Sequence, residues 1–396
     1  MDPEYKENDL IEVTVQKIVP RGLGLAFLPG LTVFVPLAAE GDRLAVRLNA
    51  VKGKTATAEI ERIIEASDDR VTPPCRHFGI CGGCDLQHLR YETQLMVKVE
   101  IIKDCLTRIG KLGVFPEIEV RASPMPFGYR SRAQWQIDGS RRTAGYNRRG
   151  SHEVVDIDEC LVLVPELQHQ LGSLRAEAAL GRFPAQLSRI DASSGDGEAV
   201  SLDSSDLVLG AHEIAVSASG DLLHFTSRVF FQGNPFLLRQ LVETAVGDAT
   251  GKTALDLYCG VGLFTLPLAR RFESVVGVEE SEEAIGFARR NSAAAGLGNI
   301  NFRARRVRNY LGSYDGPRPD LVLLDPPRSG TEKGTVRSLI GLEPSRISYV
   351  SCDPAMLARD VRTFTESGYA IDSIAAIDLF PQTHHVETVV LLHRDR

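Results

Sequence analysis

The spacing of apolar and polar residues divides the chain into three stretches. Residues 1–62 alternate short β-rich runs with turns, which is typical of a small barrel of the oligonucleotide-binding kind. Residues 63–228 are strand-rich but contain helical patterns at 85–111 and near 164–180. From residue 229 onward strands and helices alternate, which indicates a mostly parallel α/β sheet. We therefore predict a multidomain protein with parts 1–62, 63–228 and 229–396: a small β-barrel, an α+β central domain and a C-terminal α/β domain.

In the first stretch, strands are expected at 11–15, 24–27, 32–35 and 43–48, with glycine at the intervening turns. The Ser/Asp/Gly-rich segment 191–206 is expected to form loops around one short strand. Barrels of this kind commonly bind RNA, but a fold alone is weak evidence for a function.

The first strand of the α/β part, 253–257, leads into a turn containing Gly260 and Gly262 and then into an apolar helix at 263–270. The next strand ends at Glu279, an acid that can accept hydrogen bonds from both ribose hydroxyls of a nucleoside cofactor. Thr265 occupies the third glycine position of the pyrophosphate fingerprint. The incomplete fingerprint favours a cofactor without phosphates, and S-adenosylmethionine is the obvious one.

Two later strands also end in residues with ionisable or nucleophilic side chains. The strand at 320–325 ends in Asp325-Pro326-Pro327-Arg328, and the strand at 347–351 ends at Cys352. Ligands of open parallel sheets bind beyond the carboxyl ends of the strands, so a thiol there can meet a substrate. The simpler alternative is that Cys352 is a small buried hydrophobe. The last strands, near 370–378 and 386–392, flank a stretch that includes His384, His385 and Glu387.

Three cysteines lie close together as Cys75, Cys81 and Cys84, a spacing that lets three thiolates converge on one centre. Cys160 is the best candidate for a fourth ligand. Zinc held by the triplet with Cys160 or His77 is one possibility, and a four-iron cluster on the four cysteines is the other. Four cysteine ligands leave no open iron, so we expect a structural or RNA-facing role.

The bulk composition is that of an ordinary globular protein: 396 residues, 43% hydrophobic, 24% charged and a net charge of −7. No run approaches the roughly 18 apolar residues of a membrane span, and the charged N-terminus resembles no secretory signal, so a cytoplasmic location is expected.

The net charge argues mildly against nucleic acid as a partner, but its local distribution matters more. One stretch interleaves arginines with aromatic residues, which suits either RNA contact or a solvated hairpin: Tyr129, Arg130, Arg132, Trp135, Arg141, Arg142, Tyr146, Arg148 and Arg149.

Taken together, the cysteine triplet, Asp325-Pro-Pro-Arg, Ser351-Cys-Asp-Pro and His385-Val-Glu resemble the RNA 5-methyluridine methyltransferase family over nearly the whole chain. The likeness is to its iron–sulfur branch, which modifies uridines of 23S ribosomal RNA. It implies an N-terminal TRAM barrel, a central domain with a [4Fe–4S] cluster on Cys75, Cys81, Cys84 and Cys160, and a class I S-adenosylmethionine-dependent (Rossmann-like) methyltransferase domain. A monomer is favoured.

The resemblance also implies roles for single residues. Cys352 matches the nucleophile and Glu387 the base, and the cofactor contacts match Gln232, Tyr258, Glu279 and Asp325. The final strand of such domains runs antiparallel to the others, which brings Glu387 near Cys352. Leu263 and Asp353 depart from the family pattern, in which a polar residue and an asparagine are usual. A carboxylate at 353 is expected to raise the pKa of the neighbouring thiol unless a cation offsets it.

Other interpretations remain open. The same reaction on a transfer RNA uridine is one, and an amino-group methyltransferase, whose chemistry needs no thiol, is another. A cytosine methyltransferase is disfavoured, because its nucleophile usually follows the strand that here ends in Asp325. From a different class, a catalytically inactive, cluster-containing RNA-binding or assembly factor is possible.

Overall fold

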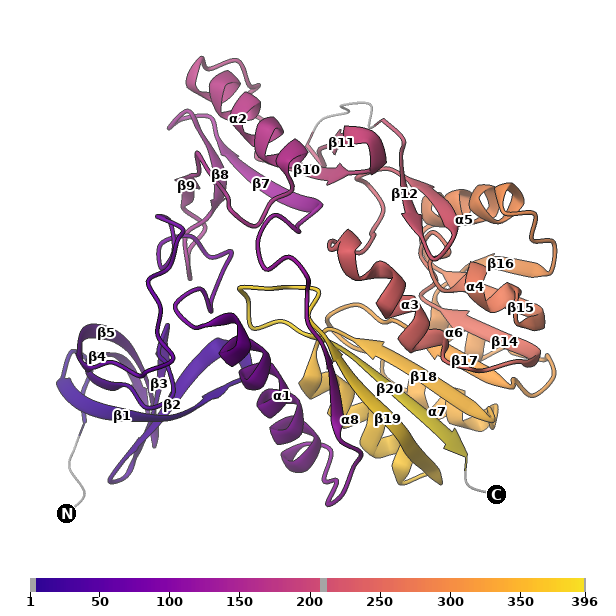
Figure 1. The fold of residues 1–396 in the computed structure, drawn as a ribbon, viewed down its shortest axis with the longest axis horizontal. Coiled ribbons are helices and arrows are strands. Elements are labelled where there is room, and N and C mark those ends of the chain that lie inside the picture. Colours follow the sequence, from indigo (N-terminus) through magenta and orange to yellow (C-terminus); the bar gives the residue numbers. More distant parts are fainter. Residues whose placement is uncertain (1–4, 207–211, 395–396) are drawn as a thin grey trace. The chain divides into compact units, whose positions relative to one another are not determined.

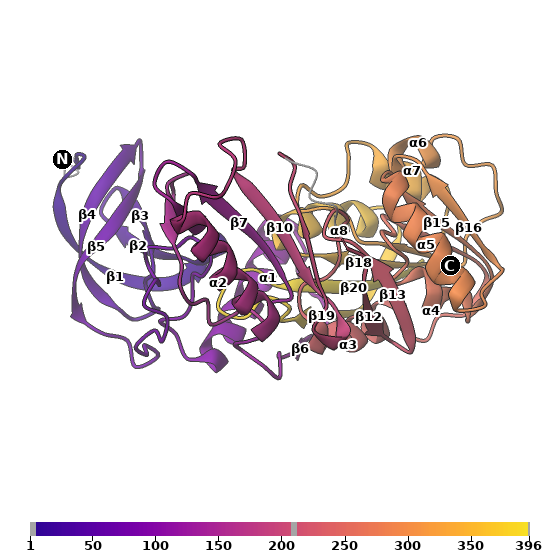
Figure 2. The same cartoon turned by 90° about the horizontal axis from the view of Figure 1, so that it is seen from above.

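The computed structural model describes residues 5–206 and 212–394, and its elements are drawn in Figures 1 and 2. The chain divides into two compact units. The first comprises residues 1–101, 146–155 and 380–385, and the second comprises residues 102–145, 156–379 and 386–396. Within the described residues, no helix combines the length and the apolar character that a membrane crossing requires.

The first unit contains a closed five-stranded barrel in the order β1-β2-β3-β5-β4. Its strands are β1 (Leu10–Val19), β2 (Leu23–Leu28), β3 (Leu31–Pro36), β4 (Arg43–Lys52) and β5 (Thr55–Glu65). The predicted small barrel is confirmed, but β5 was not among the expected strands. Its inward positions include Ala56 and Ala58, which are 2% and 1% exposed. Small alanines between polar residues give a weak alternation, so the period-2 signal was missed.

The helix expected at 85–111 is α1 (Tyr91–Arg108), and the helix expected near 164–180 is α2 (Pro165–Ala179). Figure 2 shows α2 beside β7 (Arg132–Asp138) and β10 (Arg189–Ser194), against which it packs. These strands belong to a sheet in the order β11-β10-β7-β8-β9, with β8 (Thr143–Asn147), β9 (Val154–Asp156) and β11 (Val200–Asp203). The prediction of one strand in 191–206 was therefore wrong, because β10 and β11 pair there as an antiparallel hairpin.

The second unit is built around an eight-stranded sheet in the order β16-β15-β14-β17-β18-β20-β19-β6 (Figure 1). The strands are β6 (Ile118–Arg121), β14 (Gly251–Leu257), β15 (Phe272–Glu279), β16 (Ile300–Ala304), β17 (Leu321–Leu324), β18 (Arg346–Ser351), β19 (Tyr369–Ile377) and β20 (Glu387–Arg394). β20 runs antiparallel to both of its neighbours, and the other pairings are parallel. The expectation of an antiparallel last strand is confirmed.

Helices alternate with these strands, as the sequence predicted. They are α3 (Leu238–Val246), α4 (Thr265–Ala269), α5 (Glu282–Ala294), α6 (Val307–Leu311), α7 (Thr335–Gly341) and α8 (Pro354–Thr365). A two-stranded hairpin, β12 (Ile214–Ala218) with β13 (Asp221–Phe225), precedes the sheet. α4 is shorter than the expected helix 263–270, because Gly260 and Gly262 have positive φ and the turn extends to residue 264. Ser281 caps α5, since its side chain accepts a hydrogen bond from the Ala284 N–H at 3.2 Å.

Candidate active site at the carboxyl edge of the sheet

The predicted catalytic residues of the second unit and two of its predicted cofactor contacts lie at one edge of the large sheet. Three Cα pairings fix the register there: Leu257 with Leu324, Leu324 with Tyr349, and Ser351 with Thr388. The residues directly beyond these paired positions are Tyr258, Asp325, Cys352 and Glu387. Parallel β14, β17 and β18 end at this edge and antiparallel β20 begins at it, so four segments distant in sequence converge.

Cys352 and Glu387 are neighbours across β18 and β20. They flank the paired positions Ser351 and Thr388, and directly opposite residues of antiparallel strands have Cα atoms about 4.5–5.5 Å apart. Glu387 is 2% exposed and Cys352 is half-buried. The expected pairing of thiol and carboxyl group is therefore present in the backbone register, despite the 35 positions that separate the two residues.

The surroundings of Cys352 oppose its ionisation. Burial raises the pKa of this thiol to about 12, and the carboxyl groups of Glu387, Asp325 and Asp353 act in the same direction, whereas Arg328 acts against them. Burial also raises the pKa of Glu387 well above its usual range, with Asp325 adding to the rise and Arg328 opposing it. The Cys352 thiol consequently holds its proton at neutral pH in the free protein, and burial disfavours the charged form of Glu387.

Asp353, the predicted departure from the family pattern, has a structural role in addition to its charge. It is the N-cap of α8, and its Oδ1 accepts hydrogen bonds from the N–H groups of Ala355 and Met356, each at 2.9 Å. Its effect on the neighbouring thiol has the expected sign, since it raises the pKa of Cys352. Arg328 opposes this rise but does not cancel it, since the pKa of Cys352 is still raised to about 12.

On the cofactor side, the backbone of the β14–α4 turn is held in an uncommon conformation. Tyr258 has φ of 66°, a left-handed value that side chains rarely adopt, and its N–H donates to the Val278 carbonyl at 2.8 Å. The Glu279 carboxylate accepts from the N–H of Ser281 at 2.9 Å and from that of Gly260 at 3.4 Å. The acid at the end of β15 is thus oriented by backbone donors beside the glycine turn.

Asp325 lies where β17 ends, and the Gln232 side-chain amide donates to its Oδ2 at 3.3 Å. Burial raises the pKa of Asp325 to about 7, while this hydrogen bond opposes the rise. The contact joins two of the residues expected to hold the cofactor. Leu263, the other departure from the family pattern, is 8% exposed and belongs to the core.

Two groups at this edge were not selected from the sequence. Asp256 is fully buried in β14, accepts a hydrogen bond from the Thr265 hydroxyl, and has its pKa raised to about 7 by burial. An acid inside an otherwise apolar strand is the signal that could have found it. Arg328 is exposed and forms no ion pair or hydrogen bond with any residue that the structure describes. A lone cation after an acid and two prolines was visible in the sequence, but its neighbours were not.

Comparisons with known proteins agree with this architecture. A model of the family described as tRNA (Uracil-5-)-methyltransferase matches residues 212–395. A protein of Halalkalibacterium halodurans named an uncharacterized RNA methyltransferase is 31% identical to this chain, over 98% of this chain and 97% of its own length. One of Synechocystis with the same kind of name is also 31% identical, over 98% and 97%. The chain belongs to the RNA uracil-5-methyltransferase family.

A solved structure supports the assignment over 96% of the chain. The tRNA (uracil-54, C5)-methyltransferase of Pyrococcus abyssi, in complex with S-adenosyl-L-homocysteine, matches with a TM-score of 0.77 and 28% identity, covering 96% of this chain and 100% of that one. The present RNA uracil-5-methyltransferase therefore shares its multidomain plan, with a closed small β-barrel and a methyltransferase fold, with that enzyme.

The cysteine triplet of this methyltransferase lies on an irregular loop of the first unit. The Gly83 N–H donates to Cys81 Sγ at 3.3 Å, the Gly82 N–H donates to the Asn147 carbonyl at 3.0 Å, and Arg149 donates to the Cys84 carbonyl at 2.5 Å. The seven cysteines, all in the described part of the chain, form no disulfide. Within residues 5–206 and 212–394, no three His, Cys, Asp or Glu side chains are gathered as a metal site. Cys160 belongs to the second unit, and the four-cysteine cluster stays a prediction.

The stretch that precedes Glu387 in the chain is part of the first unit. The Gln382 carbonyl accepts from the N–H groups of Asp85 and Leu86, each at 3.0 Å, and His384 Nδ1 lies 2.7 Å from Asp85 Oδ2. Arg149 contacts the other oxygen of the same carboxylate at 3.0 Å. Residues 380–385 are therefore fixed to the segment that follows the cysteine triplet.

The arginine–aromatic stretch does not form a stacking surface for bases. Trp135 is fully buried, and Tyr129 and Tyr146 are 2% and 9% exposed, so the rings belong to the core. Arg132 donates to the Val229 carbonyl at 2.6 Å, and Arg148 pairs with Glu153 at 2.7 Å. Of the two alternatives left open for this stretch, base stacking by these three rings is therefore not supported, and for Trp135 the reason is that alternate residues of β7 point inward.

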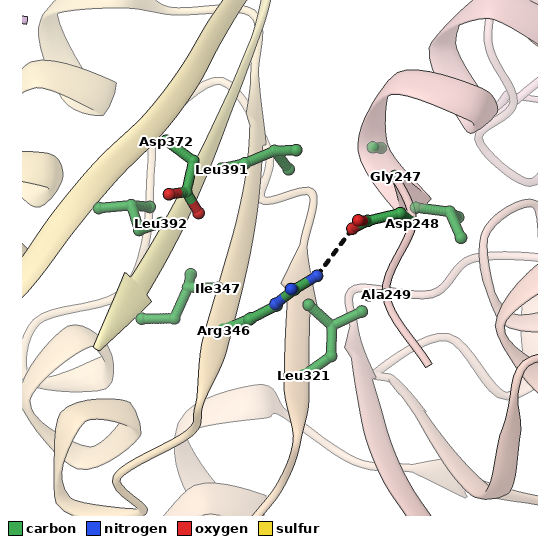
Figure 3. A pocket seen from close by; sticks show the side chains of 11 residues that line it. Gly247, Asp248, Ala249, Leu321, Arg346, Ile347, Asp372, Leu391 and Leu392 are labelled. Atoms are coloured by element: carbon green, nitrogen blue, oxygen red, sulfur yellow. Dashed lines mark hydrogen bonds and ion pairs between the residues drawn. The ribbon is translucent and has the colours of Figure 1, made fainter. Parts of the chain in front are cut away.

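At the opposite edge of the sheet, a cavity of about 260 Å³ lies beside the beginnings of β17 and β18. Figure 3 shows Arg346 and Asp248 facing each other across it, in an ion pair of 2.7 Å. None of the residues predicted for catalysis or cofactor binding lines this cavity.

Proposed function

We propose that this protein methylates carbon 5 of a uridine in RNA, with S-adenosylmethionine as the methyl donor, Cys352 as the nucleophile and Glu387 as the base. The observation that carries the proposal is the register of β18 and β20, which sets a half-buried thiol beside a buried carboxyl group at the carboxyl edge of the sheet. A methyltransferase acting on an exocyclic nitrogen has no use for such a pair.

The chemistry requires both groups. Carbon 5 of uracil is a poor nucleophile, and addition of the Cys352 thiolate to carbon 6 places electron density on carbon 5. After methylation the proton on carbon 5 must leave before the sulfur can be expelled, and Glu387 accepts it. The stacked base is out of reach of both groups, so the target uridine is flipped out or unpaired.

Gln232, Tyr258, Glu279 and Asp325 are proposed to hold the methyl donor. The acids of this edge suit a cationic ligand, and the oriented Glu279 carboxylate suits ribose hydroxyls. When bound, S-adenosylmethionine supplies an electrophilic methyl group on a sulfonium. The S-adenosyl-L-homocysteine in the Pyrococcus abyssi enzyme supports this choice of donor.

We further propose the domain plan 1–62, 63–228 and 229–396, with the barrel as a TRAM domain that contacts RNA. Cys75, Cys81, Cys84 and Cys160 are proposed to hold a [4Fe–4S] cluster. The donor chemistry supports it, since soft thiolates suit such clusters and the Gly83 N–H already points at one of the sulfurs. The proposed cluster is structural or faces RNA, and the protein is proposed to act as a cytoplasmic monomer.

The proposed substrate is 23S ribosomal RNA, by the resemblance of the cysteine pattern to that branch of the family. A transfer RNA uridine is the second candidate, favoured by the name of the Pyrococcus abyssi enzyme. Mapping 5-methyluridine by mass spectrometry in ribosomal and transfer RNA, from cells with and without this gene, distinguishes the two.

The reaction itself is tested in vitro with the purified full chain, S-adenosylmethionine and RNA from cells that lack the gene. The wild type is expected to form 5-methyluridine. Cys352→Ala is expected to form none, whereas Cys105→Ala, which alters a buried cysteine of α1, keeps the activity. Full activity in Cys352→Ala indicates an amino-group methyltransferase, and donor binding without methyl transfer by the wild type indicates an inactive RNA-binding factor.

A further inference from the structure

Asp360 lies outside the set of residues assigned above, yet it connects three segments that form the site. It is 3% exposed on α8, the helix that follows Cys352. Its Oδ2 accepts hydrogen bonds from the Tyr349 hydroxyl and from the Thr331 hydroxyl, both at 2.8 Å. Its Oδ1 accepts from Arg359 Nε, also at 2.8 Å. A buried carboxylate with three donors is a costly arrangement unless all of them are kept.

The two hydroxyls belong to the segments that carry the reacting groups. Tyr349 is fully buried in β18, three positions before Cys352. Thr331 is 7% exposed and lies three positions after Arg328, in the loop between β17 and α7. This loop also begins at Asp325, and it turns at Gly330, where φ is 75° and an added Cβ would lie 3.1 Å from Met356 of α8. The loop is therefore closely seated on the helix that Asp360 belongs to.

We propose that Asp360 is a positioning residue, which through Thr331 and Tyr349 sets the Asp325–Arg328 corner relative to Cys352. The thiol is faced by Glu387 from β20, by Asp325 and Arg328 from the corner after β17, and by Asp353 from the start of α8. Arg328 is the cation among them. If the loop is released from Asp360, Arg328 is no longer held near the sulfur. A smaller fraction of the Cys352 thiol is then ionised at a given pH.

The hydrogen bond to Thr331 is the contact to remove, because Asp360→Asn changes all three bonds at once. Thr331→Val deletes only a hydroxyl, and Thr331→Ser keeps it. Thr363→Val is the matched control, since among the described residues the Thr363 hydroxyl bonds only to the Arg359 carbonyl of its own helix, at 3.3 Å. Thermal unfolding of each variant establishes that it is folded before its reactivity is compared.

The first measurement is the rate of Cys352 alkylation by iodoacetamide against pH, followed by peptide mass spectrometry in the full chain without RNA or donor. Thr331→Val is expected to shift the alkylation profile to higher pH, with a rate at fixed pH roughly threefold to tenfold lower, since a nearby opposite charge shifts a pKa by about one unit or more. Thr331→Ser and Thr363→Val are expected to remain within about twofold of the wild type.

The second measurement rests on the proposed function and follows 5-methyluridine formation. Thr331→Val is expected to lower kcat roughly tenfold with little change in KM for RNA, because displaced catalytic groups slow the chemical step. A folded Thr331→Val with wild-type alkylation and wild-type kcat overturns the inference, as does an equal loss in Thr331→Ser. If the wild type forms no 5-methyluridine while alkylation still depends on the hydroxyl, the proposed function fails and the positioning role stands.

Discussion

The two edges of the large sheet are built from the same strands but differ in their electrostatics. At the carboxyl edge, burial raises the pKa of Asp256 and Asp325 to about 7 and that of Cys352 to about 12. At the amino edge, the side chains of Arg346 and Asp248 form an exposed ion pair beside the cavity of Figure 3. The ion pair at the amino edge is thus exposed to solvent, whereas the titratable groups at the carboxyl edge have pKa values raised by burial. The shifted pKa values of these groups, rather than the presence of a cavity, are the reason to place the candidate site at the carboxyl edge.

After the complete loss expected for Cys352→Ala, the largest expected effect at the carboxyl edge is that of Glu387→Gln. Without a base to remove the carbon 5 proton, turnover is expected to fall about 10²- to 10⁴-fold, and protein bound covalently to RNA is expected to accumulate. Denaturing gels with labelled RNA measure the accumulated species. Glu366→Gln, an exposed change at the end of α8, serves as the control. A Glu387→Gln enzyme that turns over freely excludes this base.

The pH dependence of the reaction follows from the same groups. The reactive forms are the deprotonated Cys352 and the deprotonated Glu387, and burial raises the pKa of both, to about 12 for the thiol. Because pH 6 to 9 lies below the pKa of the Cys352 thiol, the thiolate fraction increases over this range, and kcat/KM for RNA is expected to increase with it. A profile that is flat or falls with pH contradicts the assignment of these protonation states.

A stability measurement separates the two edges directly. The Asp256 carboxyl has a pKa raised from 3.8 to about 7 in the folded chain, so its contribution to stability is present below pH 4 and is lost as pH rises through 7. Asp256→Asn lacks this loss, and its urea midpoint relative to the wild type is expected to increase between pH 4.5 and 8. Asp248→Asn, at the amino edge, is expected to follow the wild-type pH dependence. If the urea midpoints of the wild type, Asp256→Asn and Asp248→Asn change with pH in the same way, the proposed difference between the two edges is contradicted.

The smallest effect is expected at the amino edge. Arg346→Ala removes an ion pair whose side chains are 49% and 90% exposed, and such pairs contribute about 0–1 kcal/mol. We expect 5-methyluridine formation within about twofold of the wild type, and a change in the urea midpoint that is close to zero. A large loss of activity in this variant assigns a function to the cavity and removes the difference between the two edges.

Much of the second unit was predictable from the sequence, because buried parallel strands are short apolar runs and their ends are marked by glycine, proline or acids. Cys352, Glu387 and Asp325 were selected from those ends. Asp360 was not, because a charged residue on a helix is normally solvated, and only tertiary packing reveals that three donors surround it. Trp135 shows the reverse case, in which a residue for which RNA contact or a solvated hairpin was considered fills the core. Contacts between distant segments leave no local pattern.

The central claim is that the Cys352 sulfur adds to carbon 6 of a uracil, and RNA containing 5-fluorouridine tests it most directly. Fluorine at carbon 5 cannot leave as a proton does, so the adduct persists after methyl transfer. Incubation with S-adenosylmethionine followed by protease digestion and mass spectrometry is predicted to place the nucleotide on Cys352, with no adduct in Cys352→Ala. An adduct that persists in Cys352→Ala, or that maps to another residue, contradicts the account.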